Sequence, residues 1–123
     1  MSYTMEVNVA KNQVIVRAYG LTEGDVPAYI ADFDNALKKL KPGFTGVTDV
    51  TGSPTVLSPE VAALLAPTGD LAIAAGVGGW VYVADSPVWK MQMKRLFGKF
   101  AVHYPTYEEA DAYLNGLSNQ SIH

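Results

Sequence analysis

Residues with carboxylate and hydroxyl side chains occur at two places where an expected strand is followed by an expected helix. Asp49 lies at the end of the expected strand over residues 44–50, and Ser58-Pro59 begins the helical pattern that follows. Asp85-Ser86-Pro87 repeats this arrangement after residues 80–84. In open α/β sheets, chemistry or recognition sits beyond the carboxyl ends of the strands. The candidate site therefore comprises Asp49, Thr51, Ser53, Ser58, Asp85 and Ser86.

This set of side chains has a functional and a structural interpretation. Functionally, it would line a pocket for a small ligand, and two helix amino termini at one edge could hold an anion. Asp49 and Asp85 would repel an anion, which disfavours phosphate. Structurally, Asp49 accepts N–H bonds from its own loop, and Ser58 caps a helix whose first position is a proline. Capping alone explains these residue types.

The sequence offers few other side chains that could act in catalysis or bind a metal. The chain has no cysteine, which excludes disulfides, thiolate metal sites and thiol catalysis. His103 is the only histidine away from the carboxyl terminus, and no second ligand stands at metal spacing, so we expect neither a metal nor a cofactor. An enzyme with Asp49 or His103 as general base is the least favoured hypothesis, because no companion groups are apparent.

Composition narrows the class of protein. The 123 residues are 49% hydrophobic and 17% charged, which fits one globular domain over residues 1–117 with a frayed tail at 118–123. A net charge of −3 argues against nucleic acid as a partner. The sequence contains no stretch of about 18 consecutive apolar residues, so it predicts no membrane span. The first residues do not resemble a signal peptide, so we expect a cytoplasmic protein.

Five segments have the pattern of strands. Residues 3–9 alternate apolar and polar side chains, and residues 14–19 alternate again after Lys11-Asn12, which predicts a hairpin because Asn tolerates left-handed backbone. Residues 44–50, 80–84 and 100–104 are the other expected strands.

Helical patterns separate the last four strands. Thr22 to Asp25 is a capping-box-like start, and apolar residues then recur at three- and four-residue steps until Pro42-Gly43. The helix from Ser58 should bend near Ala66, or divide into two with Thr68 as a cap, because Pro67 interrupts it. The third helix, before Gly98, should bury Val88, Met91, Leu96 and Phe97. The last begins at Thr106 and should end at Asn115-Gly116.

The order of elements is β-β-α-β-α-β-α-β-α. Strands that alternate with helices imply right-handed crossovers and a mostly parallel sheet. The first strand, joined to the second by a short hairpin, should form an antiparallel edge of a mixed α/β sheet.

The chain resembles the SpoIIAA-like, or STAS-like, family over nearly its whole length. The stretches that carry this resemblance are LKPGFTGVTDV, LSPEVAALL, VADSPVWKMQMKRLFG and YPTYEEADAYL. The resemblance implies a domain of βα units with helices packed beside a mixed sheet. It also implies a non-enzymatic role, either regulation by contact with a protein partner or sensing of a small ligand or lipid.

One motif of the family is altered in this chain. Its anti-sigma-factor antagonists carry a strand-end Asp and then an Asp-Ser-Ser-Gly-like motif whose serine is phosphorylated. Asp49 matches the strand-end acid and Ser58 falls near the helix start, but the local residues are Val56-Leu57-Ser58-Pro59-Glu60. The sequence is therefore more similar to a bacterial branch of the family distinct from the sporulation regulators.

Aromatic side chains suggest a surface for contact. Trp80 and Tyr82 share one face of their strand, because side chains alternate across a strand. If these rings lie opposite the helices together with other large side chains, the exposed face is a homodimer interface or a ligand platform. If a helix covers them, they form an aromatic core layer. The candidate interface residues are Arg17, Tyr19, Trp80, Tyr82 and Phe100. The leading hypothesis is a self-associating regulatory module, and the second is a binder of a small molecule or lipid.

Overall fold

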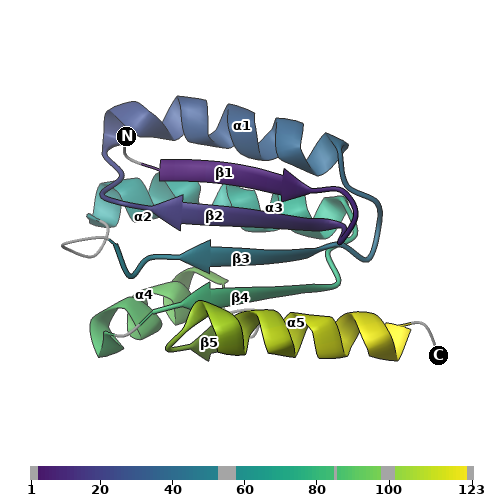
Figure 1. The fold of residues 1–123 in the computed structure, drawn as a ribbon. Coiled ribbons are helices and arrows are strands. Elements are labelled where there is room, and N and C mark those ends of the chain that lie inside the picture. The colour runs from purple at the N-terminus through teal and green to yellow at the C-terminus, as the bar shows by residue number, and fades with distance from the viewer. Residues whose placement is uncertain (1–2, 53–57, 85, 98–101, 122–123) are drawn as a thin grey trace.

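The protein forms one mixed five-stranded sheet with helices on both faces (Figure 1). The structure, a computed structural model, describes residues 3–52, 58–84, 86–97 and 102–121. The strands follow the order β1-β2-β3-β4-β5 across the sheet, with β1 antiparallel to β2 and the other pairs parallel. The predicted α/β class and the antiparallel edge strand are confirmed. The strands are β1 (Tyr3–Asn8), β2 (Gln13–Ala18), β3 (Thr45–Asp49), β4 (Gly79–Val83) and β5 (Val102–Tyr104).

The hairpin between β1 and β2 turns at the predicted asparagine. Asn12 has a φ of 53°, and its backbone N–H donates to the carbonyl of Val9. Its side chain also binds Lys41, accepting from the backbone N–H at 2.8 Å and donating to the carbonyl at 3.1 Å. One residue therefore sets the turn and fastens it to the loop before β3.

The first long helix follows its sequence signals. The Asp25 carboxylate accepts from the backbone N–H of Thr22 at 2.9 Å, and a short 3-10 turn (Glu23–Asp25) leads into α1 (Val26–Lys38). Val26, Tyr29, Phe33 and Leu37 form its buried face, as the periodicity predicts.

Pro67 divides the next helix in two, which confirms the second of the two predicted outcomes, a division and not a bend. The helices are α2 (Pro59–Leu65) and α3 (Pro67–Ala74), since a proline has no N–H to continue the first one. Thr68 does not cap α3, which corrects the expectation. It lies buried inside the first turn, and its hydroxyl donates to the carbonyl of Leu65 at 2.7 Å.

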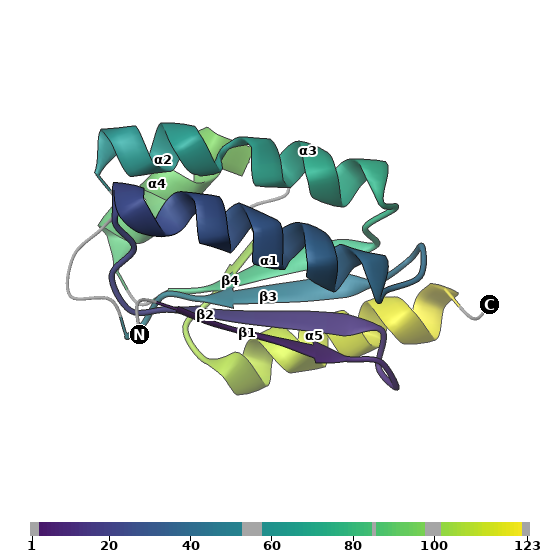
Figure 2. The ribbon, with the colours of Figure 1, turned by 90° about the horizontal axis from the view of Figure 1, so that it is seen from above.

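The helices form two layers (Figure 2). Helices α1, α2, α3 and α4 (Pro87–Phe97) cover one face of the sheet, and α5 (Tyr107–Ser121) lies alone against the other. We call these the four-helix face and the α5 face. One cluster of buried hydrophobic side chains on the α5 face comprises Val47, Val81, Val83, Ala110 and Leu114.

Two expectations about the last helices are wrong. Val88 and Met91 of α4 are 56% and 58% exposed, while Trp89 and Met93, four residues apart, are buried. Helix α5 continues to Ser121, past Gly116, so residues 118–121 belong to this helix. A glycine within a helix costs only about 1 kcal/mol, so it does not by itself end one. Among the described residues, no helix has the length and apolar character needed to cross a bilayer.

Candidate functional site

The carboxyl ends of β2, β3 and β4 meet at one edge of the sheet, where α2 begins (Figure 1). Asp49 ends β3 at this edge, and its carboxylate is held within its own turn. Oδ1 of Asp49 accepts from the backbone N–H of Thr51 at 2.9 Å and from the Thr51 hydroxyl at 2.6 Å. These contacts stabilise the turn after β3, which agrees with the interpretation that Asp49 accepts N–H bonds from its own loop.

The two serines of the candidate site act as caps. Oγ of Ser58 accepts from the backbone N–H of Val61 at 3.2 Å at the start of α2. Oγ of Ser86 accepts from the backbone N–H of Val88 at 3.3 Å at the start of α4. Ser53 and Asp85, the other two predicted members, lie outside the described residues. A joint role for the six side chains in binding a ligand stays a prediction.

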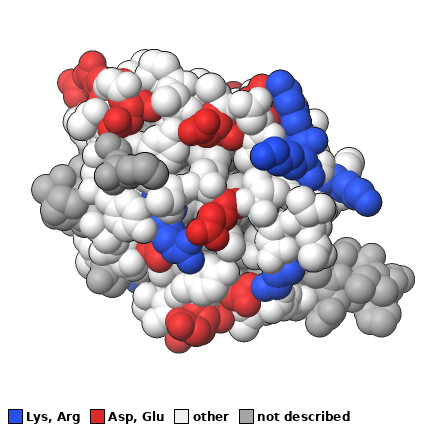
Figure 3. All heavy atoms as spheres, turned by 45° about the horizontal axis from the view of Figure 1, so that its top comes forward, with Lys and Arg blue, Asp and Glu red and all other residues white. Residues whose placement is uncertain are grey.

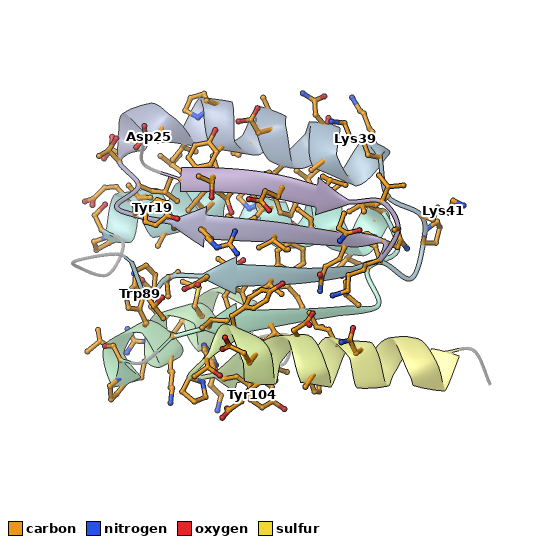
Figure 4. The ribbon with its side chains drawn as sticks, in the orientation of Figure 1. Tyr19, Asp25, Lys39, Lys41, Trp89 and Tyr104 are labelled. Atoms are coloured by element: carbon orange, nitrogen blue, oxygen red, sulfur yellow. The ribbon has the colours of Figure 1, made fainter. Side chains whose placement is uncertain are left out.

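Three lysines near the carboxyl end of α1 lie away from this edge. A patch of basic atoms covers that end of α1 (Figure 3), where Lys38 pairs with Asp34 at 3.2 Å, whereas Arg17 of β2 is in register with Asp49. Lys39 and Lys41 are at the opposite end of the molecule from Tyr19 (Figure 4). The strand-end edge therefore does not draw on the lysines of α1 to attract an anion.

The candidate interface residues divide between the two faces of the sheet. Arg17 is in register with Asp49 and Val83, and Val83 packs beneath α5. Trp80 and Tyr82 alternate with Val81 and Val83, so they lie on the four-helix face. The grouping of these aromatic residues with Arg17 on one exposed face is therefore wrong. Phe100 lies outside the described residues.

Arg17 and Tyr19 remain accessible at the surface. The Arg17 guanidinium is 3.5 Å from the Glu6 carboxylate and lies 5.8 Å from the centre of the Tyr107 ring. Its side chain is 33% exposed. Tyr19 is 43% exposed and follows β2 at the strand-end edge (Figure 4).

Trp80 and Tyr82 belong to an aromatic layer beneath the helices. The Trp80 indole N–H donates to Oγ1 of Thr48 at 2.8 Å, and its ring is 5.7 Å from that of Phe33. The ring also fills the space beside Gly46, where a Cβ would lie only 2.1 Å from it. Tyr82 is 6% exposed, and burial raises the pKa of its hydroxyl well above the usual value. The covered-core alternative therefore describes these two rings.

A cavity of about 260 Å³ lies between this aromatic layer and the helices. Its wall includes both tryptophans of the chain, and it is predominantly apolar. The lining includes the large side chains of Phe33, Trp80, Tyr82, Trp89 and Met93, and Asp70 is its charged residue among those described. Sequence reasoning missed this cavity and two of its residues, Trp89 and Met93. Their four-residue spacing on α4 is the only signal in the sequence, and it does not single them out because other apolar residues occur on several sides of this helix.

The two acid–base candidates do not come together. His103 is in register with Tyr82, and their rings are 5.7 Å apart on the four-helix face. Asp49 is in register with Val83, which faces α5. Within the described residues, no group of three His, Cys, Asp or Glu side chains could hold a metal ion.

Comparison with known proteins rests on the fold. Neither the protein-family models nor the curated proteins gave a match. Among solved structures, the anti-sigma factor antagonist SpoIIAA in its unphosphorylated form matches with a TM-score of 0.66 and 21% sequence identity. The match covers 93% of this chain and 96% of that protein. The chain is therefore a domain with the SpoIIAA-like, or STAS-like, fold.

Proposed function

We propose that this chain is a non-enzymatic regulatory module that acts by contact with other proteins, including a second copy of itself. The supporting observation is the match to an anti-sigma factor antagonist along 93% of the chain. The engagement of Asp49, Ser58 and Ser86 in turns and caps is consistent with a role that needs no catalytic set. The proposal places the module in the bacterial cytoplasm.

The proposed contact surface is the exposed part of the candidate interface. Arg17 lies in β2 and Tyr19 follows it two residues later, directly after the strand ends. The ring of Tyr107 in α5, which Arg17 contacts, extends the same surface. Tyrosine and arginine are enriched in protein interfaces because they combine a large apolar area with polar groups. The proposed interface does not include Trp80 and Tyr82, because the helices cover them.

Native mass spectrometry tests self-association. We expect a dimer for the natural sequence and a monomer for Tyr19→Glu, because the new carboxylate would be buried against the partner copy. Leu64→Glu is the matched control, since Leu64 is 46% exposed and lies on α2 in the other layer. A natural chain that is monomeric at every concentration, or an equal loss of dimer in both variants, would contradict the proposed surface.

A second candidate function is the binding of a small molecule, and the apolar cavity favours it. Most ligand sites are concave and mainly apolar, with a small number of polar groups. A mass that accompanies the purified protein in native spectra and disappears on denaturation would support this function. If this added mass is still present in the Trp89→Ala and Met93→Ala variants, the ligand binds outside the cavity.

A further inference from the structure

We propose that the cavity of the four-helix face binds one uncharged apolar molecule of about ten carbon atoms and discriminates against carboxylates. This inference rests on the second candidate function and specifies its ligand. Three features of the cavity carry the proposal: its size, the charge of its lining and the position of its mouth.

Size sets the upper limit on the ligand. The cavity measures about 260 Å³. An engineered apolar cavity of about 150 Å³ stays dry and binds benzene, so this one has room for a larger ring system or a short chain. It is too small for a full-length two-chain lipid, since ligand sites of drug-sized molecules span roughly 300–1,000 Å³.

The described residues of the lining include no lysine, arginine or histidine to pair with a carboxylate, and their hydroxyl groups belong to Tyr29, Thr48, Thr68 and Tyr82. Asp70 is the one charged residue among the described residues of the wall. Two polar side chains of the wall are already engaged, because Thr48 accepts from Trp80 and Thr68 donates to Leu65. A carboxylate inside the cavity would be unpaired and would cost several kcal/mol to bury, and one at the exposed mouth would be repelled by Asp70. A hydrocarbon, or an alcohol whose hydroxyl stays at the mouth, meets neither penalty.

The mouth of the cavity lies along α3. Ala66, Asp70 and Ile73 of the lining are exposed, whereas Phe33, Trp89 and Met93 are buried at its inner wall. A ligand would therefore place its apolar body against the aromatic rings and its head group near Asp70. This position lets the aspartate select among head groups while remaining in contact with water.

Tryptophan fluorescence reports directly on this site. The chain has two tryptophans, Trp80 and Trp89, and both line the cavity. The experiment titrates the protein with 1-decanol and, separately, with decanoate at pH 8, two molecules with the same chain length and different head charge. We expect a saturable emission change with one equivalent of decanol, and affinity for decanoate lower by about tenfold or more.

Four variants locate the effect. Asp70→Asn should raise decanoate affinity several-fold and leave decanol unchanged, because it removes the charge and keeps the shape. Ala72→Leu should weaken both ligands, since Ala72 is a buried part of the wall, and Ala74→Leu is its matched control from an exposed position outside the wall. If Ala72→Leu does not fold, Ile73→Phe narrows the mouth from an exposed position.

The outcomes separate this inference from the functions on which it rests. Equal affinity for decanol and decanoate would overturn the proposed ligand class and leave ligand binding in place. No saturable change with either probe would overturn both, while self-association measured by native mass spectrometry would be unaffected. Binding that Ala72→Leu and Ala74→Leu alter equally would place the site outside the cavity.

Discussion

The two faces of the sheet are packed by different means. On the α5 face, the fully buried side chains are branched or small, with Val47, Val81 and Val83 of the sheet against Ala110 and Leu114 of one helix. All five are at most 1% exposed. Rings that are only partly buried pack around them, from Tyr104, Tyr107 and Tyr113. On the four-helix face, large rings from the sheet and from several helices meet around a cavity of about 260 Å³.

This difference follows from the shapes of the side chains. Branched valines lie close to the sheet, and the methyl group of Ala110 lets α5 approach them closely. Rings such as Phe33 and Trp80, 5.7 Å apart at their centres, hold the helices farther away and do not fill all the space between them. We infer that the α5 face supplies mainly stability and that the four-helix face provides room for a ligand.

The largest effect should come from shortening a side chain on the α5 face. Leu114→Ala should lower the free energy of unfolding by about 3 kcal/mol, because Leu114 is 1% exposed and its removal leaves a hole in close packing. Urea unfolding measures this change. Leu64→Ala, at a position that is 46% exposed, is the control and should change stability by less than about 0.5 kcal/mol. Similar losses in both variants would contradict the close packing of Leu114 on the α5 face.

Lengthening an alanine should have different consequences on the two faces. Ala110→Leu should destabilise the protein by about 2 kcal/mol, because Ala110 is 0% exposed and its neighbours leave no room. Ala72→Leu should change stability much less, since the new side chain can enter the cavity. Thermal unfolding of both variants compares them. An equal loss in the two would mean that the cavity does not accept additional atoms.

Removal of a helix cap should have a smaller effect. Ser58→Ala should cost about 1 kcal/mol, because the N–H of Val61 loses its acceptor. Thr106→Ala, which removes the hydroxyl that accepts from Glu109 N–H at the start of α5, is the matched change in the other layer. Hydrogen exchange should accelerate more in α2 after the first change than in α5 after the second, since α2 has 7 residues and α5 has 15. The reverse order would indicate that α5 is the less firmly held layer.

The smallest effect near neutral pH concerns Tyr3. Burial and the hydrogen bond to Asp32 raise the pKa of Tyr3 from 10.0 to about 12. Between pH 10 and 12 the folded chain keeps a proton that the unfolded chain releases, so stability that is fully present below pH 10 is lost as the pH rises. Tyr3→Phe should make unfolding less sensitive to pH in this range. Unchanged pH dependence in urea unfolding would show that other groups dominate it.

Local patterns in the sequence predict most of the elements but not how they are placed. Thr22, Ser58 and Thr106 occur where helices begin because capping is a short-range requirement, and Asn12 turns the hairpin for a similarly local reason. Which face a strand residue occupies depends on where α5 crosses, and nothing near Trp80 or Arg17 in sequence records that crossing.

The same distinction applies to the candidate sites. The roles of Asp49 and Ser58 in turns and caps could be predicted, since each contacts a residue two or three positions away. The cavity could not be predicted, because it depends on rings from segments far apart in the chain. On α4, apolar residues occur on several sides, so periodicity alone did not distinguish Trp89 from Val88. The single domain over residues 1–117 stays a prediction.

The close fit between Gly46 and Trp80 couples the two positions. A Cβ at position 46 would lie 2.1 Å from the ring, so a side chain at position 46 requires a smaller residue at position 80. A double-mutant cycle measures this coupling. Gly46→Ala should lower the free energy of unfolding strongly when residue 80 is tryptophan and only slightly in the Trp80→Leu variant, because leucine leaves space for the new methyl group. Related chains should therefore be expected to change these two positions together, with the volume of the cavity changing as they do.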